Sequence, residues 1–478
     1  MHTEMAAISS QKRNLCSFVK TIVLMIVGAL TIGAWGINHV SSDENGMMIS
    51  SVLLLLAYIL LLISEVFPVS LSSMIIIGLM PFTGVTGNLS IALSGFSNQV
   101  VAFILASYGI AQSLTETPIS KRILKCIMKL AGSGSRRIIL AFMLSAAAVS
   151  SVVSSVPTCA VFLAITLEFL NLFEGDQKKQ NGKILMIGIP IASMIGGVIT
   201  PAGSSVNILA LSILEEQTGE TIRFIQWTAI GLPVALILVL IAWALLVHIY
   251  HPSEMVQKDT DRFIQDLHIP DKIQSHEKKM ILILSISFLL MLLSSWIPAI
   301  SVMTVSVLSC AVLCLPKIGV LNTKQFLNGV SWDAIFLVGT VLSFSFVMNE
   351  NGVSQMMASH FPEIGNLPLP IALLCVSFLM FLFLLFIPVA PSLIAIMLPV
   401  LIQSAENSGM SVCLITFVST ICIVNCYLLP LDTVCLLSYG HGYYKMLDMT
   451  KITLPLQIAC AIIISLISYF GFLIFHWN

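Results

Sequence analysis

Apolar runs, each long enough or nearly long enough to cross a lipid bilayer, follow one another along almost the whole sequence. A membrane-spanning helix needs about 20 apolar residues. Hydrophobic residues make up 57% of the 478-residue chain and charged residues 9%, against roughly a quarter charged in an ordinary soluble domain. No single core can bury that much apolar surface from water. The pattern excludes a soluble globular fold, a disordered chain and, with a net charge of −1, a basic nucleic-acid-binding protein.

The expected fold is therefore an all-α polytopic membrane protein with about 11 transmembrane helices and two re-entrant hairpins. The runs that supply these helices are Thr21–Ile37, Ser51–Phe67, Val69–Val85, Ser97–Leu114, Lys183–Leu214, Trp227–Ile249, Met280–Trp296, Val302–Leu315, Ala334–Met348, Ser411–Tyr439 and Ile452–Phe475.

Two further apolar stretches, 138–170 and 370–402, are too long for one helix and too short for two full crossings. Each is broken near its middle by a polar, proline-containing segment. The first break reads Ser154-Ser155-Val156-Pro157-Thr158 and the second Pro388-Val389-Ala390-Pro391-Ser392. We expect each stretch to form a hairpin that enters and leaves the membrane by the same face.

The basic residues test this topology, because short cytoplasmic loops carry an excess of Lys and Arg. With the N-terminus in the cytoplasm and both hairpins re-entrant, only Arg223 of the 22 Lys and Arg residues falls outside. A single crossing at either hairpin would invert everything that follows it. The first hairpin is thus expected to open to the cytoplasm and the second to the outside. The C-terminus lies outside, and a bacterial inner membrane is the expected location.

The two halves of the chain carry matching features in the same order, which predicts an inverted repeat. Gly95-Phe96-Ser97-Asn98 begins a helix in the first half and Gly329-Val330-Ser331-Trp332-Asp333 begins one in the second; a hairpin then follows in each. Next comes a long helix interrupted by a proline segment, at 183–214 and at 411–439. The predicted divisions are an N-terminal helix and outer loop (1–48), a first repeat (49–250), a cytoplasmic linker (251–279) and a second repeat (280–478).

This organisation predicts a transporter. Non-helical backbone at membrane depth is tolerated only where it lines a polar cavity or is buried in protein. Four breaks in two symmetric pairs predict a central site, where helix N-termini favour an anion and freed carbonyls suit a small cation. An inverted repeat also provides two equivalent openings, one to each side, as alternating access requires.

The candidate site residues are hydroxyls, amides and one carboxylate at these breaks. The predicted substrate-binding residues are Ser154, Ser155, Thr158, Asn207, Ser392 and Thr433, and the predicted cation-binding residues are Ser150, Ser154, Ser155, Gly203 and Asp432. Two simpler readings stand beside these roles: serines such as Ser150 ease helix packing in membranes, and Asn207 caps the second half of its broken helix. No Lys or Arg lies at any break, so an anion would depend on dipoles, hydroxyls and a bound cation.

Asp432 is the most informative of these residues, because a carboxylate near the middle of a bilayer costs about 2.5–3.5 kcal/mol on insertion scales. Such a residue either coordinates a cation or takes up a proton. A purely structural role, as an acid that satisfies the backbone of the broken helix, is the alternative.

At these breaks the chain resembles the divalent anion/sodium symporter family, whose members carry dicarboxylates, citrate or sulfate. The resemblance rests on the hairpin Val153-Ser154-Ser155-Val156-Pro157-Thr158, the segment 196–203 (GGVITPAG) and the segment 439–449 (YGHGYYKMLDM), and it covers most of the chain from Ser51 onward. It implies an elevator mechanism, in which a transport domain slides against a scaffold domain that also forms a homodimer. It also implies sodium as the coupling ion and no further cofactor.

The sequence departs from the family pattern at both hairpin tips. The family places a Ser-Asn-Thr segment at each tip, whereas the first tip here keeps only the serine and the second keeps none of the three. In the second broken helix, Thr433-Val434-Cys435-Leu436 stands where the family reads Thr-Pro-Pro-Asn. We therefore expect sodium-coupled transport of a small divalent anion such as succinate, malate or citrate. The alternative is a proton-coupled or exchange carrier of organic anions or sulfate that uses Asp432.

Two other functional classes are less consistent with the sequence. An intramembrane enzyme is disfavoured because there is no HExxH, no GxSxG and no pair of aspartates on facing helices. A channel explains the paired hairpins less well. The expected partners are the anionic substrate, membrane lipid and a second copy of the chain, with no nucleic acid.

Overall fold

The computed structural model describes residues 2–40, 44–64, 66–132, 134–253, 262–265, 267, 269–270, 272–297, 299–316, 319–359, 367–387, 389–425, 428–430 and 432–475. Every regular element within these ranges is helical, which confirms the predicted all-α class. Pro388, a member of the predicted second hairpin break, lies outside the described residues, as does part of the predicted linker 251–279.

The apolar runs form helices close to the predicted boundaries. Among the described residues, five helices are long and apolar enough to cross a membrane: Lys20–Val40, Asn45–Ser64, Phe224–Tyr250, Trp332–Glu350 and Met446–Phe475. Shorter apolar helices lie at Val69–Phe82, Gln99–Thr115, Ser155–Leu170, Val302–Cys314, Leu369–Leu385 and Val412–Val424. The chain is therefore a multi-pass membrane protein.

The chain divides into two compact units, and each unit draws on both halves of the sequence. Unit 1 comprises Met1–Val101, Ser331–Pro362 and Ala395–Ser404; unit 2 comprises Ala102–Val330, Glu363–Ile394 and Ala405–Asn478. The compact units therefore do not correspond to the two predicted repeats, 49–250 and 280–478, because each unit contains segments from both.

Unit 1 contains α1 (His2–Val40), α2 (Glu44–Ser64), α3 (Val69–Phe82), α4 (Leu89–Ala92), η1 (Ser94–Ser97), α16 (Trp332–Glu350) and α17 (Val353–Ser359). Two glycines hold η1 against α16. A Cβ added at Gly95 would collide with the Gly339 carbonyl oxygen, and a Cβ added at Gly339 would lie 2.6 Å from the Phe96 ring. The Gly95 N–H also donates to Ser343 Oγ at 3.0 Å. Only glycine permits this close backbone approach.

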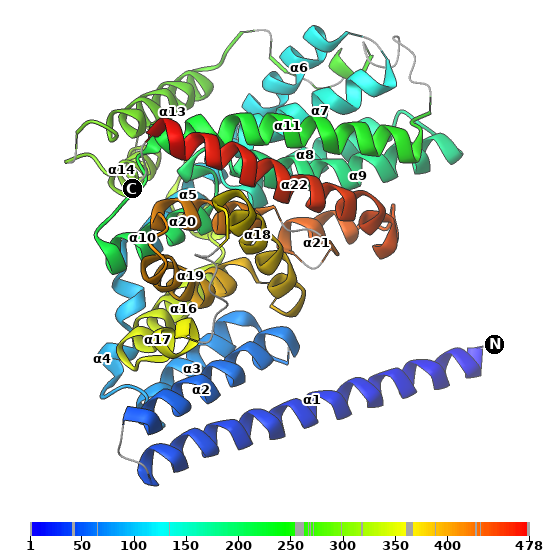
Figure 1. Ribbon diagram of the computed structural model, residues 1–478. Coiled ribbons are helices and arrows are strands. Elements are labelled where there is room, and N and C mark those ends of the chain that lie inside the picture. The colour runs from blue at the N-terminus through cyan, green and yellow to red at the C-terminus, as the bar shows by residue number, and fades with distance from the viewer. Residues whose placement is uncertain are drawn as a thin grey trace. The chain divides into compact units, whose positions relative to one another are not determined.

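Unit 2 contains most of α5 (Gln99–Thr115), with α6 (Ile119–Ala131), α7 (Ser135–Ser150), α8 (Ser155–Leu170), α9 (Gly175–Gly197), η2 (Pro201–Gly203), α10 (Ser205–Thr218), α11 (Phe224–Tyr250), α13 (Ser275–Leu293), α14 (Val302–Cys314), α15 (Thr323–Gly329), α18 (Leu369–Phe386), α20 (Val412–Val424), α21 (Thr433–Tyr439) and α22 (Met446–Phe475). The remaining helix, α19 (Ala390–Asn407), has residues in both units. The long helices α11 and α22 pack along one another, as Figure 1 shows in green and red.

Helix packing in unit 2 occurs in matching pairs. The helix α9 packs against α7, α11 and α21, and α20 packs against α18, α22 and α10. The contact between α11 and α7 likewise has a counterpart between α22 and α18. The contacts therefore match when α7 is paired with α18, α9 with α20, α10 with α21 and α11 with α22.

A buried ion pair connects α6 to the start of α13. The Arg122 guanidinium donates to Glu277 Oε2 at 2.5 Å, and Glu277 is 1% exposed. The same guanidinium donates to the Pro270 carbonyl oxygen at 2.7 Å. These bonds fix α6 to the chain that precedes the second half of the sequence.

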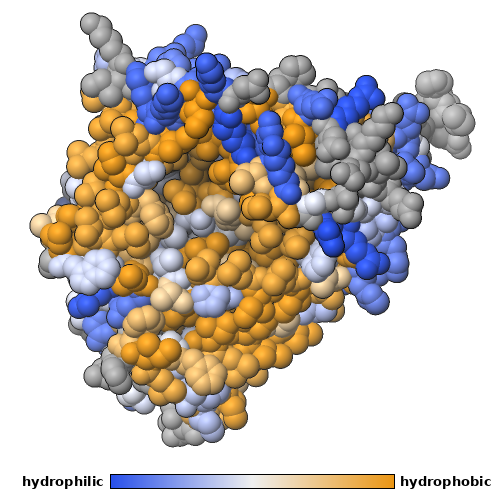
Figure 2. Space-filling model, turned by 90° about the horizontal axis from the view of Figure 1, so that it is seen from above, coloured by the Kyte–Doolittle hydropathy of each residue, from blue (hydrophilic) through white to orange (hydrophobic). Residues whose placement is uncertain are grey.

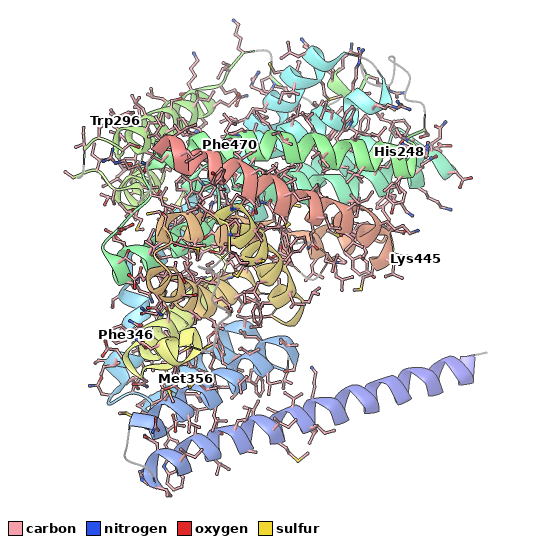
Figure 3. The ribbon with its side chains drawn as sticks, viewed as in Figure 1. His248, Trp296, Phe346, Met356, Lys445 and Phe470 are labelled. Carbon is pink, nitrogen blue, oxygen red and sulfur yellow. The ribbon has the colours of Figure 1, made fainter. Side chains whose placement is uncertain are left out.

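Large apolar side chains are exposed along the long helices of both units. Examples include Trp296 at the end of α13, Phe346 on α16 and Phe470 on α22, all labelled in Figure 3. Figure 2 shows apolar side chains over much of the face viewed, with hydrophilic side chains gathered toward its upper edge. Exposed apolar surface of this extent is expected where a protein faces lipid rather than water.

Candidate functional site

The first predicted hairpin is formed by α7 and α8, which pack against each other and are joined by a turn at 151–154. Each helix has 16 residues. At 1.5 Å per residue each is about 24 Å long, which is shorter than the roughly 30 Å hydrocarbon core of a bilayer. The helix–turn–helix form of this stretch is confirmed.

Three hydroxyl residues of this hairpin are buried, and two of them donate hydrogen bonds to backbone carbonyl oxygens. Ser150 is buried and donates to the Ser193 carbonyl oxygen of α9 at 2.5 Å. Thr158 is buried and donates to the Val153 carbonyl oxygen at 3.3 Å. Ser155, also buried, is the first residue of α8. The Ser150 bond matches the packing reading, although its oxygen keeps acceptor capacity.

Ser154 precedes α8 without making a side-chain cap, and it is half-buried. It lines a small cavity together with Ala202 of η2, Ser107 of α5 and Ser306 of α14. The cavity has a volume of about 10 Å³, close to the least that holds one water molecule. The hairpin tip and the first helix break therefore share one small cavity, which three serines and otherwise apolar side chains line.

The first broken helix is interrupted between α9 and α10, as predicted, and its freed carbonyls find protein donors. Asn207 Nδ2 donates to the carbonyl oxygens of Gly197 at 2.9 Å and Thr200 at 3.1 Å. The indole N–H of Trp227, on α11, donates to the Val198 carbonyl oxygen at 2.9 Å. Buried carbonyls must be paired in this way when a helix is interrupted. The carbonyls expected to favour a cation are thus already engaged by donors.

Gly203 lies where the two ends of this break meet. A Cβ at Gly203 would lie 2.6 Å from the Gly197 carbonyl oxygen and 3.0 Å from the Gly197 Cα. Glycine is therefore required at position 203 because two backbone segments are in direct contact there. A role of Gly203 toward a cation stays a prediction.

Asn207 is fully buried, and its two amide atoms differ sharply in their surroundings. Nδ2 is fixed by two carbonyl acceptors, which also fixes where Oδ1 points. Within the part of the chain that is described, Asn207 Oδ1 has no hydrogen-bond partner. A buried acceptor left without a partner costs about 1–3 kcal/mol, so Oδ1 is available to a bound ligand or ion.

The second hairpin stretch forms α18 and α19, and Ser392 lies in the first turn of α19. Ser392 is 1% exposed, and its hydroxyl has no hydrogen-bond partner among the described residues. Its position at the tip of a re-entrant hairpin stays a prediction.

The second broken helix is interrupted between α20 and α21. Asp432 caps α21, because its Oδ2 accepts from the Val434 N–H at 2.8 Å. A carboxylate is favourable at a helix N-terminus. Asp432 is half-buried, whereas Thr433 is exposed.

Three of the four breaks converge in unit 2. The Thr200 hydroxyl donates to the Ser151 carbonyl oxygen at 2.6 Å, which joins the first break to the first hairpin tip. The thiol of Cys159, on α8, contacts the Val434 carbonyl oxygen at 3.6 Å, which brings the start of α21 to the same hairpin. Among the described residues, no hydrogen bond joins Ser392, in the first turn of α19, to these three breaks.

A family model described as "Citrate transporter" matches residues 58–422, most of the chain. The chain belongs to this family. The resemblance predicted from the hairpin and the broken helices is thereby confirmed, and the chain is a transporter rather than an enzyme.

Two curated relatives match this chain along almost its full length. An uncharacterized transporter of Haemophilus influenzae is 24% identical, over 98% of this chain and 98% of its own. The sodium-dependent dicarboxylate transporter SdcS of Staphylococcus saprophyticus is 23% identical, over 97% of this chain and 93% of its own. The crystal structure of the YdaH transporter of Alcanivorax borkumensis aligns with a TM-score of 0.49 and 14% identity, over 83% of this chain and 88% of that one.

One polar residue of this citrate transporter family member was missed by sequence reasoning. Asn425 ends α20 at the second break, is fully buried and donates from Nδ2 to the Ile421 carbonyl oxygen at 3.1 Å. Its Oδ1, like that of Asn207, has no partner in the described part of the chain. The available signal was an asparagine directly after a helix without charged residues and shortly before Pro430.

Proposed function

We propose that this protein is a secondary active transporter that moves a small divalent anion, such as succinate, malate or citrate, by an elevator mechanism with sodium symport. The observation that carries the proposal is the pair of interrupted helices in unit 2, α9–α10 and α20–α21. Their matching packing partners support an inverted repeat, and interrupted helices in such repeats are where secondary transporters bind substrate and coupling ion.

The anion would be held without cationic side chains. Segments 150–158, 196–207, 387–393 and 425–434 contain no Lys or Arg. Helix N-termini, here those of α8 and α10, carry partial positive charge and unpaired N–H groups. The hydroxyls of Ser154, Ser155 and Ser392 would add donors, and a bound cation would offset the remaining charge.

The cation would be held by oxygen atoms that the protein leaves without donors. The carbonyl oxygens Oδ1 of Asn207 and Asn425 are buried, one at each broken helix, and both face away from the carbonyls that fix their amide nitrogens. Amide oxygens are suitable ligands for a hard cation. Ser150, Gly203 and Asp432 complete the proposed cation-binding set.

The remaining assignments follow the family. SdcS is named as a sodium-dependent dicarboxylate transporter, which supports sodium as the coupling ion and a dicarboxylate as the substrate. We further propose a homodimer in a bacterial inner membrane, in contact with lipid, with the N-terminus in the cytoplasm and the C-terminus outside. The distribution of Lys and Arg supports this orientation.

Uptake into proteoliposomes tests the transport proposal. Radiolabelled succinate, citrate and sulfate would be offered under an imposed sodium gradient, an imposed proton gradient or neither. We expect the sodium gradient to drive accumulation of at least one carboxylate. Accumulation that ignores both gradients would exclude symport, and counterflow alone would identify an exchanger.

The alternative is coupling to protons through Asp432, which supplies the one carboxylate in the four break segments. Asp432→Asn is a sharp test, because asparagine is also a good N-cap and can accept from the Val434 N–H. The helix cap is therefore kept while the titratable group is removed. We expect this variant to transport without ion coupling. Unchanged pH and sodium dependence would reject a coupling role for Asp432.

A further inference from the structure

A second, larger hollow lies on unit 2. It has a volume of about 650 Å³ and is lined by Asp176, Lys179, Gln180, Lys183, Tyr250, His441, Gly442 and Tyr443. Pockets of about 300–1,000 Å³ are typical of small-molecule sites. Lys183 and Gly197 belong to the same helix, and 14 residues at 1.5 Å each place them about 21 Å apart along α9. The seven residues of α21, about 10 Å long, separate Asp432 of the second break from the loop that carries His441. The hollow thus shares no lining residue with the proposed transport site.

Three segments distant in sequence build this hollow: the first turns of α9, the end of α11 and the loop between α21 and α22. The loop contains most of the segment 439–449 (YGHGYYKMLDM), to which the transport mechanism assigns no role. Figure 3 labels His248 and Lys445, which mark the end of α11 and this loop on the same side of unit 2.

The inner wall of the hollow is held in place by hydrogen bonds and one ion pair. The Lys183 ammonium lies 2.9 Å from Asp448 and 5.0 Å from the centre of the Tyr250 ring. The Tyr250 hydroxyl donates to the Asp448 carbonyl oxygen at 2.5 Å. The side chain of Gln180 donates to the Tyr250 carbonyl oxygen at 3.2 Å. A wall fixed in this way costs little further ordering when a ligand binds.

The loop wall is also anchored. Buried Tyr444 shares a hydrogen bond with Ser438 at 2.8 Å, and burial raises the pKa of its phenol above the ordinary value, so the group stays neutral. The ring of Tyr443 packs directly over Gly182, where a Cβ would collide with it. The loop therefore presents His441 and Tyr443 to the hollow from a stable base.

The charge on the lining favours an anion. Asp448 already has two ammonium neighbours, Lys183 and Lys451. Lys179 is 83% exposed, and among the described residues it forms an ion pair with Asp176 at 4.0 Å, which is itself wholly exposed. An exposed pair of this kind contributes little, so the Lys179 ammonium can turn to a ligand. His441 is exposed beside it and adds a ring N–H donor.

We propose that this hollow binds a small organic or inorganic oxyanion with two or more negatively charged oxygens, held by Lys179 and His441 at its mouth and by Lys183 within. Carboxylates and phosphates share this chemistry. The surrounding lysines belong to segments expected in the cytoplasm. The ligand is thus a cytoplasmic anion that binds away from the transported one.

Chemical modification of His441 tests the site on the complete chain. The protein, in nanodiscs of zwitterionic lipid, would be treated with diethyl pyrocarbonate with and without citrate or inorganic phosphate, and labelling would be followed by mass spectrometry. We expect either probe at millimolar concentration to slow labelling of His441 while exposed His248, outside the lining, labels unchanged. Protection by one probe alone identifies a carboxylate or a phosphate as the preferred ligand.

Two single substitutions make the test specific. Lys179→Ala should raise the probe concentration needed for protection about tenfold, the loss expected for one charged hydrogen bond. Lys178→Ala is the matched control, because Lys178 contacts Asn171 and does not line the hollow. The proposal is overturned if neither probe protects His441, if His248 is protected equally, or if Lys178→Ala weakens protection as much as Lys179→Ala. None of these readouts depends on transport.

Discussion

Asn207 offers the sharpest test of the first helix break, because one fully buried amide there makes two hydrogen bonds and leaves one oxygen without a partner. In Asn207→Ala both donors are lost. The Thr200 carbonyl oxygen keeps a second donor, the Gly203 N–H at 3.1 Å. Within the described part of the chain, the Gly197 carbonyl oxygen depends on Asn207 alone. The damage should therefore centre on Gly197.

The magnitude follows from these partners. The bond to Thr200 contributes about 0.5–1.5 kcal/mol, and an orphaned Gly197 carbonyl costs about 1–3 kcal/mol. The sum is about 2–4 kcal/mol. With an unfolding entropy of roughly 2.1 cal/mol/K per residue, about 1 kcal/mol/K for 478 residues, the apparent Tm should fall by about 2–4 °C.

The assay is thermal unfolding of the purified chain in nanodiscs, with sodium or with choline in its place. Asn207→Asp separates the two roles of the side chain, since aspartate keeps oxygens for a cation but loses both N–H donors. If Oδ1 binds sodium, sodium stabilises the wild type and Asn207→Asp but not Asn207→Ala.

Asn349→Ala is the control, because Asn349 is exposed on α16. A Tm for Asn207→Ala within 1 °C of that control would refute the hydrogen-bond reasoning. Equal sodium stabilisation of the two Asn207 variants would refute the cation role.

Two further perturbations test the packing. Gly203→Ala should destabilise the chain by about 1–3 kcal/mol, because its Cβ would lie 2.6 Å from the Gly197 carbonyl oxygen. The control is Gly78→Ala, whose Cβ would have nothing within 4 Å and which should leave the Tm unchanged or raised. Similar Tm values for the two variants would contradict the crowding at Gly203. Arg122→Met should lower the free energy of unfolding by about 3 kcal/mol, because it leaves the buried Glu277 carboxylate without its ion-pair partner. Adding Glu277→Met should restore much of that loss, and denaturant unfolding measures both variants. A double variant no more stable than the single one would show that the unpaired charge is not the cause.

Much of the fold was predictable because bilayer thickness sets a length for each helix. The stretches 138–170 and 370–402 failed that length test, and each became two helices. The breaks at Pro201 and Pro430 were predictable for a local reason, since each proline removes a backbone donor close to a polar residue that can cap the next helix. Proline alone is not sufficient, because Pro190 lies within α9.

The side-chain environments were less predictable, because they depend on segments distant in sequence. Gly203 predicted a close approach, but only the fold shows that the approaching group is Gly197. Asn425 has the ordinary sequence context of a helix-terminal residue, and its unpaired Oδ1 follows from packing around α20. The two compact units could not be read from the sequence, because each combines helices from both halves.

The two broken helices have matching packing partners but different chemistry. The first saturates its carbonyls with Asn207 and Trp227, whereas the second carries the carboxylate of Asp432. Because both lie in one continuous chain, a substitution in one is not copied into the other, as it would be in a dimer of half-length chains. Fusion therefore lets each break diverge on its own: one can keep a rigid framework while the other is altered for a new ion, and the overall geometry is retained throughout.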